Sequence, residues 1–543
     1  MAVAMRKTWA HEIIIGLFEQ LRWSYLPPLM VYLAYGISGL TSIVGTFFVK
    51  EYLDLSAEFL AALGFWAGIP WALKMPVGHL IDIIWKWKAV LVYLGALLVS
   101  ASLLIMYGLI AHTDAMTAVM PAAAWFVLSA LLSPTGYILQ DAVADAMTVE
   151  AVPVLDENGE PFAEDDVKAM HTTMQMLGRF ALIGGIALVA VVNITMFNGV
   201  ADMSEAEKVG IYADIYLLAL AVPLVSVVGV ILGGIMLRHR ARKLRATGLP
   251  PAEVDAMLFR PDGEAHPNWW ILGGSLVFAA FTISVGLSGF GYSEEVVFAG
   301  SMAIVCFLIS RLLPELEPAQ RLALIGTSII VFVFRAIPSP GAGSAWFNID
   351  ELGFDQQFFS VLTLISAGLA MVGMVVLRPL MATRSIAYIV VLLSLFAGIL
   401  SLPDIALYYG IHEWTAPLTG GVVDARFIAL IDTAIESPLG QVSLIPVLAW
   451  IAKTAPVHLK ATFFAVMASF INLGLSAGAL GTKYLNQIFL VTREVRDRTT
   501  GEVQVPADYS ELGMLLITVA VLTLALPLIV VAVIQPTRLR TPR

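Results

Sequence analysis

Long apolar runs recur from one end of this chain to the other, and they constrain its fold more than any other feature. Runs of about 20 residues with few charges match the thickness of the hydrocarbon core of a bilayer. Each run predicts a membrane-spanning helix, because a helix satisfies its own backbone hydrogen bonds in hydrocarbon. A mean hydropathy of +0.85 agrees with this prediction. The sequence therefore predicts an all-α polytopic membrane protein.

Fourteen such runs are bounded by charges or by Pro/Gly clusters. They lie near 27–49, 58–80, 87–111, 117–148, 168–197, 212–237, 268–289, 294–314, 319–337, 357–378, 384–402, 425–452, 460–490 and 512–535. The first six and the last six form two groups, which predicts two six-helix bundles with two extra spans between them. The predicted parts are an amphipathic N-terminal segment (1–26), a bundle (27–237), a cytoplasmic linker (238–267), a two-helix hairpin (268–314), a second bundle (319–535) and a tail (536–543).

Lysine and arginine set the expected orientation. Most of the 31 basic residues fall in the loops that lie on the cytoplasmic side if both termini are cytoplasmic. The richest basic segment, "LRHRARKLR" at 237–245, opens the predicted linker. The N-terminal residues hold no small-residue cleavage site, so we expect no removable signal peptide. In a bacterium this protein would lie in the inner (plasma) membrane.

Composition excludes several classes of function. A net charge of −10 without a basic tract argues against a nucleic-acid partner. The single cysteine, Cys306, cannot form an intrachain disulfide, and the eight histidines lack the spacing of metal ligands. No Gly-rich phosphate-binding loop follows a strand, so we expect no nucleotide, no other cofactor and no enzyme activity. The expected partners are the lipid bilayer and a small molecule.

Charged residues within the spans are the candidate site residues, since a charge in hydrocarbon usually faces a partner or a wet cavity. Arg179, Arg335, Asp432 and Glu436 are candidates for substrate binding or for internal ion pairs. Arginine holds carboxylates bidentately, and a carboxylate accepts hydrogen bonds from the N–H edge of a planar heterocycle. The same carboxylates could instead carry a coupling proton. Lys74, Arg335 and Lys483 lie close enough to span ends to reach water with their long side chains, which is the alternative for each of them.

Aromatic residues within the first two spans complete the candidate site. Tyr32, Tyr35 and Trp66 can stack on a planar substrate or hydrogen-bond to it. The alternative is that they pack within the bundle.

The loop after the second span carries a recognisable pattern. Gly78 is followed by Asp82 and then by Lys86 and Lys88, which resembles the loop signature of the major facilitator superfamily. Four further segments are similar to the folate-biopterin transporter family, in the same order: "AALGFWAGIPWALK", "DAVADAMTVE", "FRAIPSP" and "APVHLKATFFAVMAS". They are distributed over both six-span groups.

This resemblance implies a secondary transporter that moves a pterin- or folate-like anion by alternating access, with protons as the candidate coupling ion. The alternatives are a carrier for another organic anion and a non-transporting assembly or pigment-delivery factor on the same fold. The resemblance also implies a gate at the cytoplasmic side, in which Asp141 or Asp145 pairs with one of the two loop lysines. Asp82 would face the start of span 13, and Glu150 would be an ordinary helix-end charge.

Overall fold

The computed structural model of the chain describes most of its length. The described residues are 21–53, 55–72, 74–153, 162–246, 248, 250–259, 269–377, 384–440, 460–496 and 503–541. Residues 1–20 of the predicted amphipathic segment, most of the acidic loop after the fourth span and the end of span 12 lie outside these ranges. In a few helical stretches only the backbone is described.

Helices make up almost all of the described chain. The N-terminal elements are η2 (Trp23–Tyr25), α3 (Leu26–Ile37), η3 (Ser38–Thr41), α4 (Ser42–Tyr52), α5 (Ala57–Ala72), α6 (Lys74–Ile83), η4 (Trp85–Trp87), α7 (Ala89–Ala111), α8 (Thr113–Thr117), α9 (Ala122–Ala151), α10 (Glu164–Met196), η5 (Val200–Asp202), α11 (Glu205–Ala219), α12 (Ala221–Ala246) and α13 (Pro251–Phe259). The hairpin consists of α14 (Trp269–Leu287) and α15 (Ser293–Leu312). The C-terminal elements are η6 (Leu313–Glu315), α16 (Pro318–Arg335), α17 (Ala342–Asp350), α18 (Gln356–Val376), α20 (Ile386–Tyr408), α21 (Ile411–Leu418), α22 (Ala425–Gly440), α24 (Lys460–Ile488), the strands β1 (Val495–Arg496) and β2 (Val503–Val505), and α25 (Leu512–Ile534).

Over the residues that the structure describes, every predicted span coincides with one or more helices. Within the described residues, 11 helical stretches are long and apolar enough to cross a membrane, and a shorter apolar helix lies at Leu272–Gly286. The sixth span is longer than predicted, because α11 and α12 together run from Glu205 to Ala246. The basic start of the predicted linker therefore continues the span as a helix, and α13 follows it.

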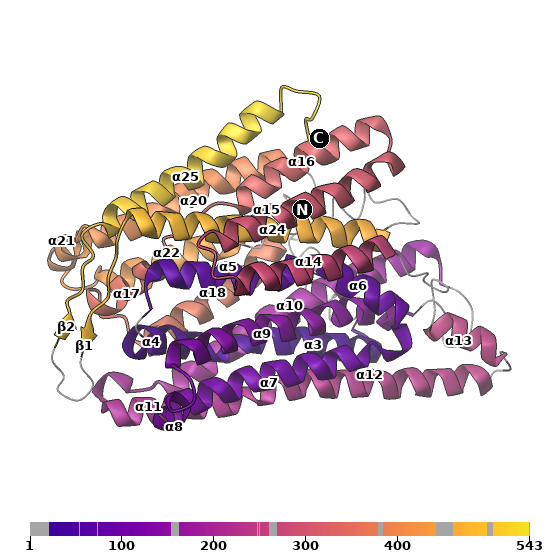
Figure 1. The fold of residues 1–543 in the computed structure, drawn as a ribbon, viewed down its shortest axis with the longest axis horizontal. Helices are drawn as coiled ribbons and strands as arrows, with labels where there is room; N and C mark the ends of the chain where they lie inside the picture. The colour runs from indigo at the N-terminus through magenta and orange to yellow at the C-terminus, as the bar shows by residue number, and fades with distance from the viewer. Residues whose placement is uncertain are drawn as a thin grey trace, which may run out of the picture.

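The helices run along the long axis of the molecule as two groups (Figure 1). In the N-terminal group α3 packs against α9, α10 and α12, and in the C-terminal group α16 packs against α20, α24 and α25. Two helix pairs join the groups, namely α5 with α24 and α10 with α18. We call the end that carries α17, α21 and the strands the β end, and the opposite end the α13 end (left and right in Figure 1).

The hairpin α14–α15 lies beside the seam between the two groups. It contacts α5 and α6 from the N-terminal group and α24 from the C-terminal group. Lys483 of α24 lies 3.3 Å from a carboxylate oxygen of Glu294 and 3.1 Å from one of Glu295, both at the start of α15. Lys483 therefore contacts protein carboxylates instead of reaching toward water.

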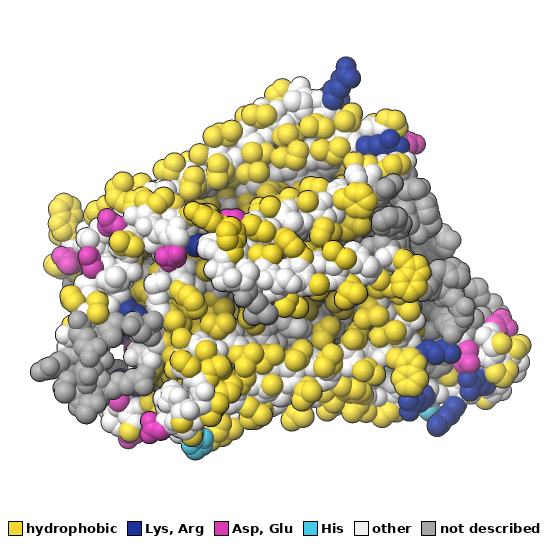
Figure 2. Space-filling model, in the orientation of Figure 1, with side chains coloured by type: hydrophobic (Ala, Val, Ile, Leu, Met, Phe, Trp, Pro, Cys, Tyr) yellow, Lys and Arg dark blue, Asp and Glu magenta, His cyan; other side chains and the backbone are white. Residues whose placement is uncertain are grey.

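The surface matches a protein that spans a bilayer. Hydrophobic side chains cover the middle of the face shown in Figure 2, and most of its charged side chains gather at the two ends. Many large apolar side chains are exposed there, among them Leu276 and Val277 of α14. In a soluble protein such a surface would be an interaction site or a liability, whereas here the lipid solvates it. The protein is an integral, multi-pass membrane protein.

Candidate functional site

Two spans in equivalent positions are broken near their middle. The first span is interrupted between α3 and α4 by the 3-10 turn η3, and the ninth is interrupted between α16 and α17 by residues 336–341. In each case a buried asparagine from the span four places later donates to a carbonyl in the break. Asn193 of α10 donates to the Leu40 carbonyl at 3.3 Å, and Asn486 of α24 donates to the Pro340 carbonyl at 3.2 Å. The two bundles thus share a structural repeat.

Glycines let the backbones meet at both breaks. A Cβ added at Gly36 of α3 would lie 2.0 Å from the Leu182 carbonyl oxygen, and one added at Gly478 of α24 would lie 2.9 Å from the Ile337 carbonyl oxygen. Close packing through small residues is a common means of helix association in membranes. Because broken helices expose polar backbone groups, they are found at depth only where protein or a cavity surrounds them.

A charged cluster lies beside the first break. The Lys74 ammonium, at the start of α6, lies 2.6 Å from an Asp141 oxygen and 2.7 Å from an Asp145 oxygen. The Tyr32 hydroxyl donates to the other Asp145 oxygen at 2.7 Å. The Arg179 guanidinium of α10 interacts electrostatically with Asp141 and Tyr32. Two cations and two carboxylates therefore balance, and protonation of one aspartate would loosen its hold on Lys74.

In this structure the predicted gate lysines are not the partners of Asp141 and Asp145. Asp141 and Asp145 do share one face of α9, as their spacing predicted, but both contact Lys74. Lys88 instead pairs with Glu150, which therefore has a partner across the bundle. The reason lies in span 2, where α6 packs against α9 and so brings Lys74 to the two aspartates.

Lys86 and Asp82 are the remaining predicted gate residues. Lys86 lies exposed in η4. The Asp82 side chain lies outside the described part of the chain, and so does its predicted contact with span 13.

The predicted aromatic residues lie in two separate places, Tyr32 and Tyr35 in α3 and Trp66 in α5. The Tyr35 ring lies 5.8 Å from the Trp71 ring and 5.6 Å from the Tyr137 ring, centroid to centroid. Tyr32 and Tyr35 both belong to α3, so this aromatic group adjoins the charged cluster. Trp66 instead donates its indole N–H to Glu294 of the hairpin at 3.0 Å. The polar atom of Trp66 is therefore satisfied by the hairpin, away from the other two predicted aromatic residues.

Trp71 and Tyr137 were missed by the sequence reasoning. Nothing in their sequence context distinguishes them from packing aromatics. Among the remaining predicted residues, Arg335 ends α16 at the second break. Asp432 lies in α22, one residue before Thr433. Glu436 follows on the same helix, but its side chain lies outside the described residues.

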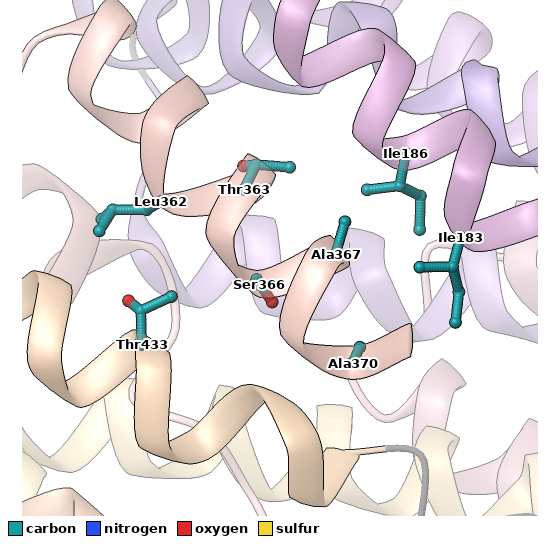
Figure 3. A pocket seen from close by; sticks show the side chains of 8 residues that line it. All are labelled: Ile183, Ile186, Leu362, Thr363, Ser366, Ala367, Ala370 and Thr433. Atoms are coloured by element: carbon teal, nitrogen blue, oxygen red, sulfur yellow. The ribbon is translucent and has the colours of Figure 1, made fainter. Parts of the chain in front are cut away.

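A cavity of about 300 Å³ separates α10, α18 and α22 (Figure 3). It is lined by Ile183, Ile186, Thr363, Ser366, Ala367 and Thr433, with Leu362 and Ala370 beside them. Apolar walls with a few hydroxyl groups are typical of small-molecule sites, and this volume is at the lower end of their range. Of the residues that the structure describes, none of the predicted charged ones lines this cavity. Cavity and charges are separate parts of the interface between the two bundles.

The β end is closed by contacts between the bundles. Lys50 at the end of α4 pairs with Asp350 at the end of α17, and the Tyr509 hydroxyl donates to the same carboxylate. Arg493 donates to the Lys50 carbonyl oxygen. Burial and the neighbouring Asp350 raise the pKa of Tyr509 above the usual value for a tyrosine, so the phenol keeps its proton and remains a donor. Gln356 of α18 also reaches across to α11.

Two sequence comparisons support the predicted family resemblance. Residues 309–541 match the sequence model of the BT1 family. A folate-biopterin transporter from Synechocystis sp. (strain ATCC 27184 / PCC 6803 / Kazusa) is 24% identical over 162 residues. This match covers 29% of the chain and 32% of that relative, so it spans about a third of the relative's length. These two matches confirm the predicted resemblance to the folate-biopterin transporter family.

Solved structures share the fold over nearly the whole chain. A POT family transporter in complex with 5-aminolevulinic acid has a TM-score of 0.58 at 13% identity, with 96% of each chain covered. The nucleoside transporter NupG (D323A mutant) has a TM-score of 0.52 at 13% identity, covering 94% of this chain and 99% of that one. At such identities the likeness shows the fold alone. The predicted major-facilitator-type fold is confirmed.

Proposed function

We propose that this protein is a secondary transporter that moves a pterin- or folate-like organic anion across the membrane by alternating access. The bundles 27–237 and 319–535 would move against each other around their interface, with the hairpin 268–314 outside it. Both termini would be cytoplasmic. The observation that carries the proposal is the pair of broken spans in equivalent positions, because such spans mark the substrate site in transporters built from repeats.

The groups beside the breaks have the chemistry that this substrate requires. A pterin ring is planar and can stack on the aromatic group around Tyr35. Its amino and ring N–H edge can donate a pair of hydrogen bonds to a carboxylate, for which Asp432 and Glu436 are the candidates. The name of the Synechocystis relative supports this substrate class.

Protons are the proposed coupling ion. Lys74 is held between two carboxylates, and the buried cluster is balanced only when both are ionised. A proton on Asp141 or Asp145 would remove one of its two counter-ions and release the contact between α6 and α9. Taking up and losing a proton could thus change the packing of span 2 during each cycle.

Uptake by proteoliposomes tests the proposal. Purified protein should accumulate biopterin or folic acid, and an inward proton gradient should increase the initial rate. Arg179→Ala and Glu436→Gln should lower uptake without lowering the amount of protein in the membrane. Lys243→Gln, an exposed change near the end of α12, is the matched control and should leave uptake unchanged. Uptake of unrelated organic anions alone would favour the alternative carrier, and no uptake of any would favour an assembly factor.

A further inference from the structure

Arg335 is a half-buried cation at the second break, and its Nε atom is fully buried. Leu324, Ser328 and Val331 are buried, and Arg335 follows them on the same face of α16 at intervals that a helix brings into line. Its side chain therefore continues the inward face of α16 rather than its lipid face. The helix ends at this residue, and the chain then crosses the irregular segment 336–341 before α17.

The guanidinium has no counter-ion in the described part of the chain. No carboxylate there forms an ion pair with Arg335, and its Nε is buried without a hydrogen-bond acceptor. The buried lysines differ, since Lys74 and Lys483 each contact two carboxylates. An isolated charge in a membrane span is costly, so it is usually retained because something outside the chain compensates it.

The surroundings of Arg335 hold its stem while leaving its polar end available. A Cβ added at Gly474 of α24 would lie 2.9 Å from the Arg335 Cβ, so the glycine permits this close approach. On the preceding turn the Phe332 ring packs on the Phe470 ring, with centroids 5.1 Å apart. Helix packing thus positions the guanidinium, and no acceptor among the described residues bonds to its Nε.

We propose that Arg335 binds the carboxylate of the transported substrate at the break in span 9, and that it selects carboxylated, folate-like conjugates over neutral pterins. This inference rests on the proposed function and deepens it. A planar guanidinium presents two parallel N–H donors to a carboxylate, which supplies both the missing charge and the missing acceptors. A lysine at the same place would supply only a point charge.

The test compares two probes in wild-type and variant protein. Folic acid carries carboxylates, whereas biopterin is neutral and has the same ring system. Arg335→Gln should raise the KM for folic acid uptake about 10- to 100-fold, the range expected from loss of a charge-assisted hydrogen-bonded pair, and should leave the KM for biopterin within about twofold. Arg335→Lys should give an intermediate KM for folic acid. Arg242→Gln, an exposed arginine in α12, is the matched control and should change neither.

Two outcomes would overturn the inference. Equal losses for both probes would assign Arg335 to the folding of the break, and unchanged KM values would remove it from the site. A second measurement separates this inference from the proposed function, namely the shift in Tm that folic acid produces in detergent. Suppose that the wild type shows no uptake, and that folic acid raises the Tm of the wild type but not that of Arg335→Gln. The carboxylate site would then be supported and the proposed transport function refuted. If uptake occurs and Arg335→Gln is unaffected, transport stands and the site fails.

Discussion

Removing Lys50 should open the β end. Lys50 is the N-terminal bundle's contribution to the contact with Asp350, and its side chain is 8% exposed while that of Asp350 is 21% exposed. Truncating one partner of a buried ion pair costs about 3–5 kcal/mol, because the other charge is left uncompensated. The exposure of Asp350 places the expected cost for Lys50→Ala near the lower value. About 3 kcal/mol corresponds to roughly a 100-fold change in the ratio of closed to open protein.

Cysteine labelling measures this ratio. The only cysteine, Cys306, can be replaced by serine, and Ala57→Cys then places a single thiol in the buried group that joins α5 to Trp346 of α17. A membrane-impermeant maleimide added at the β end should label this thiol faster in Lys50→Ala by up to about 100-fold, if opening is fast relative to labelling.

The control removes the cation of a more exposed ion pair at the same end. Lys208→Ala breaks only the i,i+3 pair with Glu205 on α11, whose carboxylate side chain is 70% exposed, and such pairs contribute little. It should label at the wild-type rate. Equal labelling rates for Lys50→Ala and wild type would refute the view that the Lys50–Asp350 pair holds this end shut.

Three further expectations follow from the described contacts. Lys74→Gln should lower the Tm in detergent and abolish uptake, because Asp141 and Asp145 lose their shared cation. Changing one of these aspartates to asparagine as well should restore the charge balance and recover the Tm. A Tm that does not recover would assign the loss to packing. Gly36→Ala should prevent accumulation of folded protein because its Cβ would overlap a carbonyl of α10, whereas Gly184→Ala, which meets nothing within 4 Å, should be tolerated; similar yields of both would contradict the packing at the first break. Tyr509→Phe should speed maleimide labelling at the β end about tenfold. In the wild type the opening rate, corrected for the reactivity of the thiol, should not change between pH 7 and 9, because the raised pKa of Tyr509 keeps its phenol protonated. An opening rate that rises over this range would show that the phenol ionises.

The spans were predictable because the bilayer imposes a length and a composition on each of them. About 20 apolar residues are needed whatever the neighbouring helices are, so each span can be recognised locally. Every predicted run coincides with a helix, and the four quoted segments identified the family that the comparisons support. The i,i+4 spacing of Asp141 and Asp145 likewise placed both on one face of α9.

The ion-pair and hydrogen-bond partners of the charged residues could not be predicted from the local sequence. Lys86 and Lys88 belong to the loop signature, but the packing of α6 on α9 brings Lys74 to the aspartates. Trp66 bonds to Glu294, which follows it by 228 residues. Such pairings depend on the bend of each span and on its neighbours, and neither leaves a mark in the local pattern.

The breaks in spans 1 and 9 were only partly predictable from the sequence. The segment "IPSPG" at 337–341 contains turn residues that signal an interruption, whereas "SGLTS" at 38–42 is a weaker signal. Spans 5 and 13 share a glycine followed eight positions later by an asparagine. The two segments are "GIALVAVVN" (185–193) and "GALGTKYLN" (478–486). That repeat could have located both breaks, since each asparagine donates to one of them.

By itself the sequence determined that this chain spans a membrane repeatedly, where its helices lie and which family it resembles, because those properties follow from hydrophobicity along the chain and from short motifs. Only the tertiary structure decided which charges neutralise each other and which one has no counter-ion among the described residues. Lys74 is satisfied by two aspartates, and Arg335, equally conspicuous in the sequence, meets no carboxylate among the described residues. The physical reason is that an ion pair requires contact within about 4 Å, and contacts between spans are set by how the helices break, bend and pack.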